Sequence, residues 1–269
     1  MISPLAHIHP EAKIGKDVKI DPFAVIEKNV IIGDGSHIMS HVVIMENTTL
    51  GKSCKVFPGA VLGAIPQDLK FNGEITTVQI GDNTTIRECV TVNRGTKDKW
   101  KTVVGSNCLL MAYCHIAHDC NISNHVIIAN SVQLAGHVEI GEYAIIGGMA
   151  AAIQFSKIGA HTYIAGGTEI IKDVPPYIKA GRSPLSYVGI NSVGLQRRGF
   201  SNKKINSILE IYRNIYMHGL NITQATHIIE KELPDSEEKR EILQFIKESK
   251  RGILKISSKE KPDEDQQEM

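Results

Sequence analysis

Aliphatic residues recur at every sixth position along most of this chain. The series comprises Ile2, Ile8, Ile14, Ile20, Ile26, Ile32, Ile38, Ile44, Leu50, Val56 and Leu62, then Ile80, Ile86 and Val92, then Val104, Leu110, Ile116, Ile122, Ile128, Leu134, Ile140, Ile146, Ala152, Ile158, Ile164 and Ile170. Of these 26 positions, 25 hold Ile, Leu or Val, which is far too regular to arise by chance. A period of six residues is a signature of parallel β-helices.

The physical reason for this prediction is the way that short strands can close on themselves. Six residues form one short strand and a corner, and three hexads close a triangular coil in which each aliphatic residue points inward. Successive coils stack at about 4.8 Å, the spacing of parallel strands. Each coil buries its inner face only against its neighbours, so the structure is quasi-one-dimensional. The period therefore predicts an all-β parallel β-helix.

A second column of small or β-branched residues follows four positions after the aliphatic residues. Four of the five cysteines belong to it, namely Cys54, Cys108, Cys114 and Cys120, so they are predicted to pack in the core. Cys89 falls outside the column and is assigned no role. Glycine often follows the aliphatic residue directly, as Gly33 does, and we expect it to relax the backbone of a tight corner.

The hexads are interrupted twice, from about residue 63 to 79 and from about 93 to 102. Interruptions of a solenoid form loops on one face, which is often the working face. The first loop carries Asp68 and Lys70 near a proline turn and could hold a polar ligand. The second is charged and could equally be an ordinary solvated loop.

The repeat ends near Pro175 and Pro176, because proline cannot continue a strand ladder. An irregular stretch is expected up to about residue 199, followed by three helices. These are predicted to begin after the caps Ser201, Thr223 and Ser236 and to end near residues 218, 233 and 252. The expected domains are a β-helix over residues 1–190, a helical domain over 191–256 and a charged disordered tail over 257–269.

Composition narrows the function classes. The chain has 30 Lys and Arg against 29 Asp and Glu, which argues against a dedicated nucleic-acid binder. Its N-terminus lacks a basic segment followed by a long apolar run, so no signal peptide is expected. The longest nearly apolar run is too short to form a transmembrane segment. A cytoplasmic protein with reduced thiols fits best.

The segment that carries chemistry is 113–120, which contains His115, His118 and Asp119. Strand alternation turns His115 outward, and His118 and Asp119 lie at the next corner. One coil above His118 stands Gly136, beside His137, and one coil further stands Gln154. A neutral imidazole can accept a proton from a hydroxyl, and a bare amide can stabilise an oxyanion, so this column favours acyl transfer.

Two other functions remain open at this point. His115, His118 and His137 could form a three-histidine zinc site of the type found in β-helical carbonic anhydrases. The chain could also be a non-catalytic binding or structural module, although an outward column of His, Gly and Gln makes this less favoured.

The chain resembles the acyl-[acyl-carrier-protein]–UDP-N-acetylglucosamine O-acyltransferases over almost its whole length. The strings that carry the resemblance are Gln67-Asp68-Leu69-Lys70, Ile86-Arg87-Glu88, Asn93-Arg94-Gly95-Thr96, His115-Ile116-Ala117-His118-Asp119-Cys120, Leu134-Ala135-Gly136-His137, Ile145-Ile146-Gly147-Gly148-Met149, Asp173-Val174-Pro175-Pro176-Tyr177 and Gly194-Leu195-Gln196-Arg197-Arg198-Gly199-Phe200. The resemblance implies a left-handed helix, a homotrimer with clefts between subunits, and neither metal nor cofactor. It further implies transfer of an (R)-3-hydroxyacyl group from acyl carrier protein to the 3-hydroxyl of UDP-N-acetylglucosamine, the first step of lipid A synthesis.

Residue roles follow from the same resemblance. His118 matches the general base, Asp119 a group that orients or polarises it, and Gly136 the amide that binds the oxyanion. The positions that match substrate contacts are Asp68, Lys70, His115, His137 and Gln154 for the sugar nucleotide and acyl group, Gly166 for acyl length, and Asn191, Arg197 and Arg198 for the nucleotide. Positions that differ from the family pattern are Ile153 and Val193, which weakens the nucleotide assignment.

The resemblance also bears on partners and on a related enzyme. A basic stretch would suit the acidic acyl carrier protein, and it comprises Lys179, Arg182, Arg197, Arg198, Lys203 and Lys204. The related N-acyltransferase of the same pathway has an extra N-terminal uridine-binding domain. Because the hexads begin at Ile2, that enzyme is disfavoured. The preferred acyl length, and whether the acceptor carries a 3-hydroxyl or a 3-amino group, are left open by the sequence.

Overall fold

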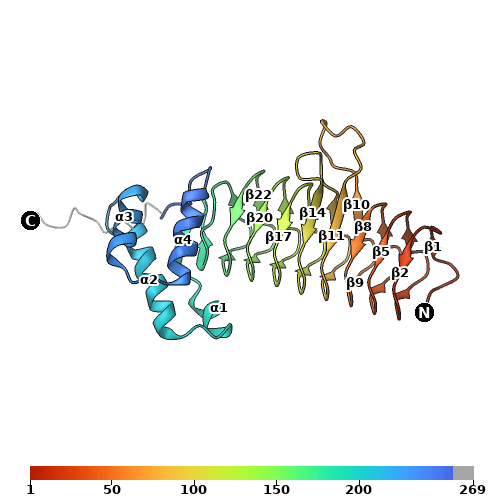
Figure 1. The fold of residues 1–269 in the computed structure, drawn as a ribbon, viewed down its shortest axis with the longest axis horizontal. Helices are drawn as coiled ribbons and strands as arrows, with labels where there is room; N and C mark the ends of the chain where they lie inside the picture. The colour runs from red at the N-terminus through yellow and green to blue at the C-terminus, as the bar shows by residue number, and fades with distance from the viewer. Residues whose placement is uncertain (257–269) are drawn as a thin grey trace, which may run out of the picture.

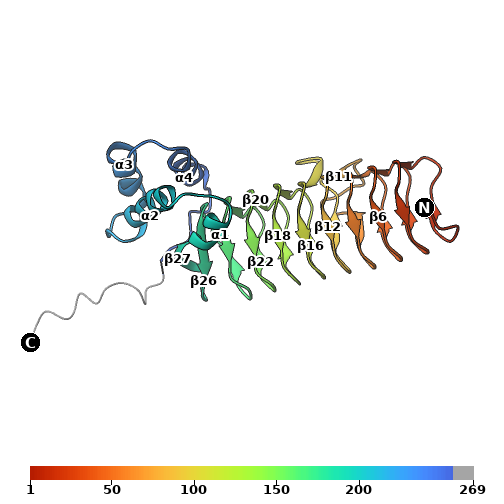
Figure 2. The ribbon, with the colours of Figure 1, turned by 90° about the horizontal axis from the view of Figure 1, so that it is seen from below.

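The computed structural model describes residues 1–256, so the predicted tail at 257–269 lies outside the described residues. Residues 7–181 form a left-handed parallel β-helix whose short strands make three walls, and helices follow at its C-terminal end (Figure 1). This confirms the predicted fold class. Seen from below, the coils stack in a single row with the helices beside the last ones (Figure 2).

Each wall is one sheet to which every third hexad contributes a strand. The first wall holds β1 (His7–Ile8), β4 (Val25–Ile26), β7 (Val43–Ile44), β10 (Val61–Ala64), β13 (Thr91–Asn93), β16 (His115–Ile116), β19 (Gln133–Leu134), β22 (Ala151–Ala152) and β25 (Glu169–Ile170). The second holds β2 (Lys13–Ile14), β5 (Ile31–Ile32), β8 (Thr48–Leu50), β11 (Thr77–Ile80), β14 (Lys101–Val104), β17 (Asn121–Ile122), β20 (Glu139–Ile140) and β23 (Lys157–Ile158). The third holds β3 (Lys19–Ile20), β6 (His37–Ile38), β9 (Lys55–Val56), β12 (Thr85–Ile86), β15 (Leu109–Leu110), β18 (Ile127–Ile128), β21 (Ile145–Ile146), β24 (Tyr163–Ile164), β26 (Ile178–Gly181) and β27 (Ser186–Ile190).

Three corners join these walls, and they are named here by chain order. The first corner leads from the first wall to the second, the second corner from the second wall to the third, and the third corner back to the first wall. Between interruptions the register is one coil, so that His115 pairs with Gln133 and Gln133 with Ala151. A residue therefore stands directly over the residue one coil earlier.

The second residue of each strand pair fills the prism. In β18, Ile128 is fully buried, whereas its neighbour Ile127 points outward and is only partly covered. Fully burying one such side chain is worth about 1.5–3 kcal/mol, and the ladder repeats this gain in nearly every hexad. The predicted packing of the four cysteines is also confirmed, since Cys54, Cys108, Cys114 and Cys120 are buried. Cys89 is exposed.

The glycines that follow the aliphatic residues serve a different purpose from the one expected. The left-handed backbone falls two residues further on and is adopted by residues with side chains, such as Asp119 (φ 60°) and Phe155 (φ 63°). A Cβ on Gly33 would instead lie 2.5 Å from the carbonyl carbon of Gly51 in the next coil. These glycines are required because adjacent coils approach closely, rather than because the corner needs a left-handed residue.

Both interruptions are inserted at the first corner. One loop joins β10 to β11 and the other joins β13 to β14, and they project from the same side of the helix (Figure 1). Asn93 ties them together, because its Nδ2 donates to the carbonyl oxygen of Ile65 at 3.0 Å. The two loops therefore form one structure beside a single corner.

The chain after Pro176 is more regular than expected. β26 pairs in parallel with β24, and β27 returns antiparallel to β26, so the third wall continues after the prolines. Pro175 and Pro176 precede β26 and therefore lie outside its pairing with β24. A short helix, α1 (Ser192–Arg197), follows and is capped by the side chain of Asn191.

Three longer helices complete the described chain: α2 (Asn202–Tyr216), α3 (Ile222–Glu232) and α4 (Glu237–Glu248). Ser201 and Ser236 cap α2 and α4 as predicted. The predicted cap of α3 was wrong, because Asn221 is the cap and forms a reciprocal capping box with Gln224. The helix α4 ends at Glu248, before the predicted Gly252.

The segment after α4 returns to the β-helix, where Ile253 forms a bridge with Asp173. None of the helices in residues 1–256 combines the length and the apolar character needed to cross a membrane. The division into domains at residue 190 stays a prediction, as does the cytoplasmic location.

Candidate active site

The first corner brings His118 and Gly136 together. Gly136 lies one coil above the imidazole, and a Cβ on it would be 2.5 Å from Cε1 and 2.7 Å from Nε2 of His118. Position 136 must therefore be glycine if the imidazole of His118 is to keep its place. His118 is nevertheless almost buried, with 5% of its surface exposed.

Hydrogen bonding fixes the tautomer of His118. Its Nδ1 lies 2.8 Å from Oδ2 of Asp119, and a carboxylate can only accept, so Nδ1 carries the proton. Nε2 then has a free lone pair. The carboxylate of Asp68, on the first loop, approaches Nε2 to 4.0 Å. The imidazole is therefore arranged to accept a proton on the side that faces the first loop.

Asp119 is held by the second loop. Its Oδ1 accepts from the amide of Thr96 at 2.9 Å and from the amide of Lys99 at 3.3 Å. Its Oδ2 accepts from the hydroxyl of Thr96 at 2.7 Å. Burial alone would raise the pKa of the Asp119 carboxyl, but the hydrogen bonds from Thr96 and His118 lower that pKa below its usual value. Asp119 is accordingly an anion inside the protein.

The other two histidines flank this pair. His137 stands over Asp119, with Nε2 3.7 Å from Oδ2 of that residue and Nδ1 3.2 Å from Oδ2 of Asp98. Its ring stacks on Phe155 at 4.4 Å, and burial lowers the pKa of His137 more than the nearby Asp119 raises it. Nδ1 of His115 is 2.7 Å from the hydroxyl of Thr91, and burial lowers the pKa of His115 too.

A surface hollow of about 340 Å³ opens beside His118. It is lined by Gln67, His115, Ala117, His118, Gln133, Leu134, Ala135, Gly136, Ala151, Ala152 and Gln154. Lys70 is exposed on the first loop, and its amide donates to Oδ1 of Asp68 at 2.9 Å. The site thus combines one basic imidazole, a glycine and several polar side chains around an open space.

Metal binding was the alternative for these histidines. Within residues 1–256, the ligand atoms that cluster within 4.8 Å belong to His118, Asp119 and His137, so His115 is not part of the group. A carboxylate offers about four lone-pair sites. Thr96, Lys99 and His118 already donate four hydrogen bonds to the carboxylate of Asp119, so a metal ion would have to displace one of these donors. Among the described residues, the three histidines of the alternative zinc site therefore do not form one ligand group.

The remaining predicted residues lie at other corners. Gly166 is exposed at the third corner, where a Cβ would be 2.7 Å from the carbonyl oxygen of Gly148. Asn191 and Arg198 are at the second corner, where Asn191 Nδ2 donates to the carbonyl of His161 and an Arg198 amino group to that of Tyr143, both at 2.9 Å. A single chain therefore does not bring these three residues to His118.

The remaining predicted residue, Arg197, and the two positions that differ from the family pattern are exposed. Arg197 and Val193 are exposed on α1, and Ile153 is exposed next to Gln154 on the first corner. The predicted basic stretch is partly neutralised, because Lys204 Nζ pairs with Glu238 at 2.8 Å.

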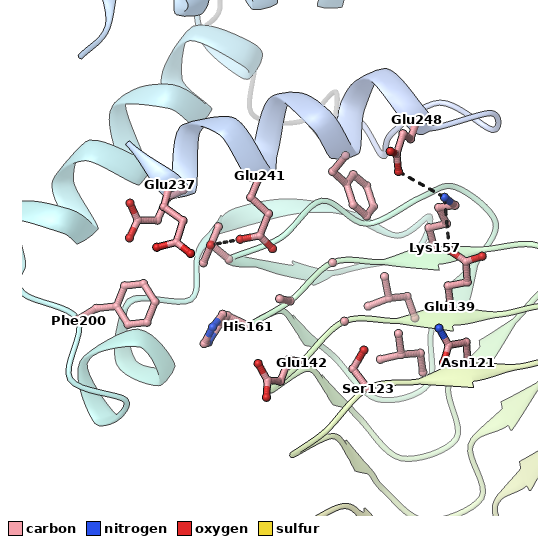
Figure 3. A pocket seen from close by; sticks show the side chains of 18 of the residues that line it. Asn121, Ser123, Glu139, Glu142, Lys157, His161, Phe200, Glu237, Glu241 and Glu248 are labelled. Carbon is pink, nitrogen blue, oxygen red and sulfur yellow. Dashed lines mark hydrogen bonds and ion pairs between the residues drawn. The ribbon is translucent and has the colours of Figure 1, made fainter. Parts of the chain in front are cut away.

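A separate hollow of about 560 Å³ lies between the second wall and α4 (Figure 3). Acidic side chains of both elements line it, including Glu139, Glu142, Glu237, Glu241 and Glu248. Lys157 bridges Glu139 and Glu248 at 3.3 and 3.8 Å. The Tyr177 hydroxyl donates to Glu241, whose pKa is raised by burial. None of the predicted site residues lines this hollow.

Sequence reasoning missed the residues that contact His115, Asp119 and His137, namely Thr91, Thr96, Asp98 and Lys99. The available signal was the position of the second interruption, since both breaks fall between a first-wall and a second-wall hexad. Counting coils would have placed both loops at the corner of His118.

Comparison with known proteins identifies the family of the chain. The family model described as "Udp N-acetylglucosamine O-acyltransferase; Domain 2" matches residues 173–254, and that of six bacterial transferase hexapeptide repeats matches 11–46 and 101–136. The acyl-[acyl-carrier-protein]–UDP-N-acetylglucosamine O-acyltransferase of Thermodesulfovibrio yellowstonii is 44% identical over 93% of this chain and 97% of its own length. The enzyme of the same name from Myxococcus xanthus is 41% identical over 94% and 99%.

The solved structures include a UDP-N-acetylglucosamine acyltransferase from Bacteroides fragilis. It is 51% identical to this chain, covers 95% of it and 100% of its own length, and superposes with a TM-score of 0.94. The chain therefore belongs to the family of acyl-[acyl-carrier-protein]–UDP-N-acetylglucosamine O-acyltransferases.

Proposed function

We propose that the chain transfers an (R)-3-hydroxyacyl group from acyl carrier protein to the 3-hydroxyl of UDP-N-acetylglucosamine, the first step of lipid A biosynthesis. The observation that carries the proposal is the column of His118 beneath Gly136, in a chain of this family. The imidazole supplies a base, and the glycine leaves room beside it for the reacting carbonyl.

The reaction follows from these two groups. Nε2 of His118 takes the proton of the sugar 3-hydroxyl as its oxygen attacks the thioester carbonyl. Asp119 stabilises the imidazolium that forms, in the manner of the carboxylate of a catalytic triad. The tetrahedral intermediate then expels the carrier thiolate, which receives the proton from His118. The acyl group ends as an ester on the sugar, and the carrier ends as a free thiol.

The amide of Gly136 is the proposed oxyanion donor. Its neighbours are engaged, since Ala135 N donates to Ala152 O at 3.0 Å and His137 N donates to His118 O at 3.0 Å. In the part of the chain that the structure describes, no acceptor is found for the Gly136 amide. An amide that is free for the transition state typically contributes a few kcal/mol to catalysis.

The substrate-binding residues around His118 are Asp68, Lys70, His115, His137 and Gln154, and we assign them to the sugar nucleotide and the acyl hydroxyl. Asn191, Arg197 and Arg198 are assigned to the nucleotide and lie at the second corner or on α1. Because one chain keeps these two sets apart, we propose that the site is completed by a second copy in a homotrimer. Gly166 is assigned to the wall of the acyl groove.

The test is an acyl-transfer assay on the purified protein with labelled UDP-N-acetylglucosamine and (R)-3-hydroxyacyl carriers of several lengths. The variant His118→Ala should lose at least about 100-fold in kcat, the usual range for a general base. His7→Ala is the matched control, because His7 is an exposed histidine on the same wall as His115. Light scattering should show that all three proteins are trimers.

Two results would contradict the proposal. One is a His118→Ala enzyme with near wild-type turnover. The other is stoichiometric zinc in the purified protein together with carbonic anhydrase activity and no acyl transfer. Replacing the acceptor by its 3-amino analogue in the same assay decides which nucleophile the site prefers.

A further inference from the structure

We propose that Thr96 is a positioning residue for acyl transfer, which acts on His118 through the carboxylate of Asp119. The inference rests on the proposed function, because it concerns the same base. Thr96 lies on the second loop, after β13, and its side chain does not line the hollow beside His118.

Thr96 holds both oxygens of Asp119 at once. Its amide donates to Oδ1 at 2.9 Å and its hydroxyl to Oδ2 at 2.7 Å. Oδ2 is the same oxygen that receives Nδ1–H of His118 at 2.8 Å. Two bonds from one residue fix the plane of the carboxylate, and that plane sets the direction of the imidazole. Hydrogen bonds to a charged partner are also the strong ones.

Within residues 1–256, the hydroxyl of Thr96 donates to one acceptor, Oδ2 of Asp119. The amide of Asp98 donates to Oγ1 of Thr96 at 3.2 Å, which occupies the acceptor side of the hydroxyl. The hydroxyl proton is therefore directed at Asp119. Thr96 and Asp119 are exposed by only 8% and 4%, so this bond is shielded from water.

The loop is built to hold Thr96 in place. Trp100 N donates to the carbonyl of Thr96 at 2.7 Å and closes the loop. Arg94 pairs with Glu46 at 3.2 Å and anchors the beginning of the loop to an earlier coil. A Cβ on Gly95 would collide with the backbone of Lys101, so the entry to the loop also requires glycine.

The titratable groups around Asp119 come from its own corner, from the coil above and from the two loops. His118 is on its own corner, His137 is on the coil above, and Asp98 and Lys99 are on the loop. Asp68 approaches the far nitrogen of His118 from the first loop. Without the Thr96 hydroxyl, the anion loses a donor. The His118–Asp119 pair then takes up its first proton more readily, and the protonated pair has no free base.

The experiment compares Thr96→Val, Thr96→Ser and Thr84→Val. Thr96→Val should lower kcat about tenfold or more with little change in KM, because Thr96 does not line the hollow. The acid limb of its kcat profile should move to higher pH by about one unit, as expected for one lost hydrogen bond to a charged group. Thr96→Ser should restore both values to near wild type.

Thr84→Val is the matched control for packing. Thr84, like Thr96, is buried in the protein, but its hydroxyl donates to the carbonyl of Gly105 at 2.8 Å, away from the first corner. It should lose stability and keep the wild-type pH profile. The proposal is overturned if Thr96→Val keeps that profile too, or if Thr96→Ser fails to rescue it. A wild-type protein without acyl-transfer activity would instead refute the proposed function.

Discussion

The contact between Gly136 and His118 gives the sharpest prediction. In Gly136→Ala the new methyl group would lie 2.5 Å from Cε1 and 2.7 Å from Nε2 of the imidazole. Carbon atoms in contact are normally about 3.5–4.0 Å apart, so the ring must move back by about 1 Å. The ring is nearly buried and is tied to Asp119, so this movement disrupts the 2.8 Å bond to the carboxylate.

A displacement of about 1 Å in a reacting group can cost about 100-fold in rate. We therefore expect kcat of Gly136→Ala to fall about 100-fold. Overpacking of this kind also costs about 1–3 kcal/mol of stability, so the assay must be run well below the Tm of the variant. Steady-state kinetics and thermal unfolding of the same preparations separate the two effects.

Gly181→Ala is the matched control for this substitution. A Cβ on Gly181 would meet its nearest atom, the Cβ of Ala165, at an ordinary 3.5 Å. It should keep wild-type kcat. If Gly136→Ala keeps kcat within about twofold while remaining folded, then His118 and Gly136 do not share one reaction centre and the reasoning fails.

Two further predictions concern the stack itself. Ile128→Ala should lower the free energy of unfolding by about 2–5 kcal/mol in denaturant titration. Ile127 is the outward neighbour, and Ile127→Ala should lower that free energy clearly less. Equal losses would contradict the assignment of the inner face. Burial, with the Arg198 guanidinium adding to it, lowers the pKa of His161 to about 4, below the value of about 6.5 in an unfolded chain. The unfolded state therefore binds the extra proton first, so the contribution of His161 to stability is constant above about pH 7 and is lost as the pH drops from about 6.5 to 4. His161→Phe keeps a ring between Tyr143 and Tyr177 and should flatten that part of the Tm–pH curve; identical curves would refute the assignment.

The parts of the fold that a period encodes could be predicted from the sequence. Because a coil holds three hexads, the order of the walls and the place of Ile128 in the core follow from counting. The same count puts Gly136 over His118 without any knowledge of side-chain contacts. Helix caps are local signals of the same kind, and Ser201 and Ser236 were found because a serine directly precedes each helix.

Features that depend on contacts between distant residues could not be predicted. The second loop has no period, so counting coils places the loop at the corner of His118 but does not show that Thr96 contacts Asp119. At α3, Asn221 and Thr223 are both capping residues, and the choice of Asn221 depends on the reciprocal bond to Gln224. The glycine of a hexad can serve a bend or a close approach, and only the neighbouring coil distinguishes the two.

Chain length and rotation are coupled in the coils around the site. Removing a single hexad between His118 and Gly136 would turn everything that follows by about a third of a revolution. Glu142 would then arrive above the imidazole, where a Cβ alone is already too large. Insertions and deletions here are therefore tolerated only as whole coils or as loops that project from the stack. Both loops of this chain lie at the first corner, where added residues bring side chains close to His118 and Asp119.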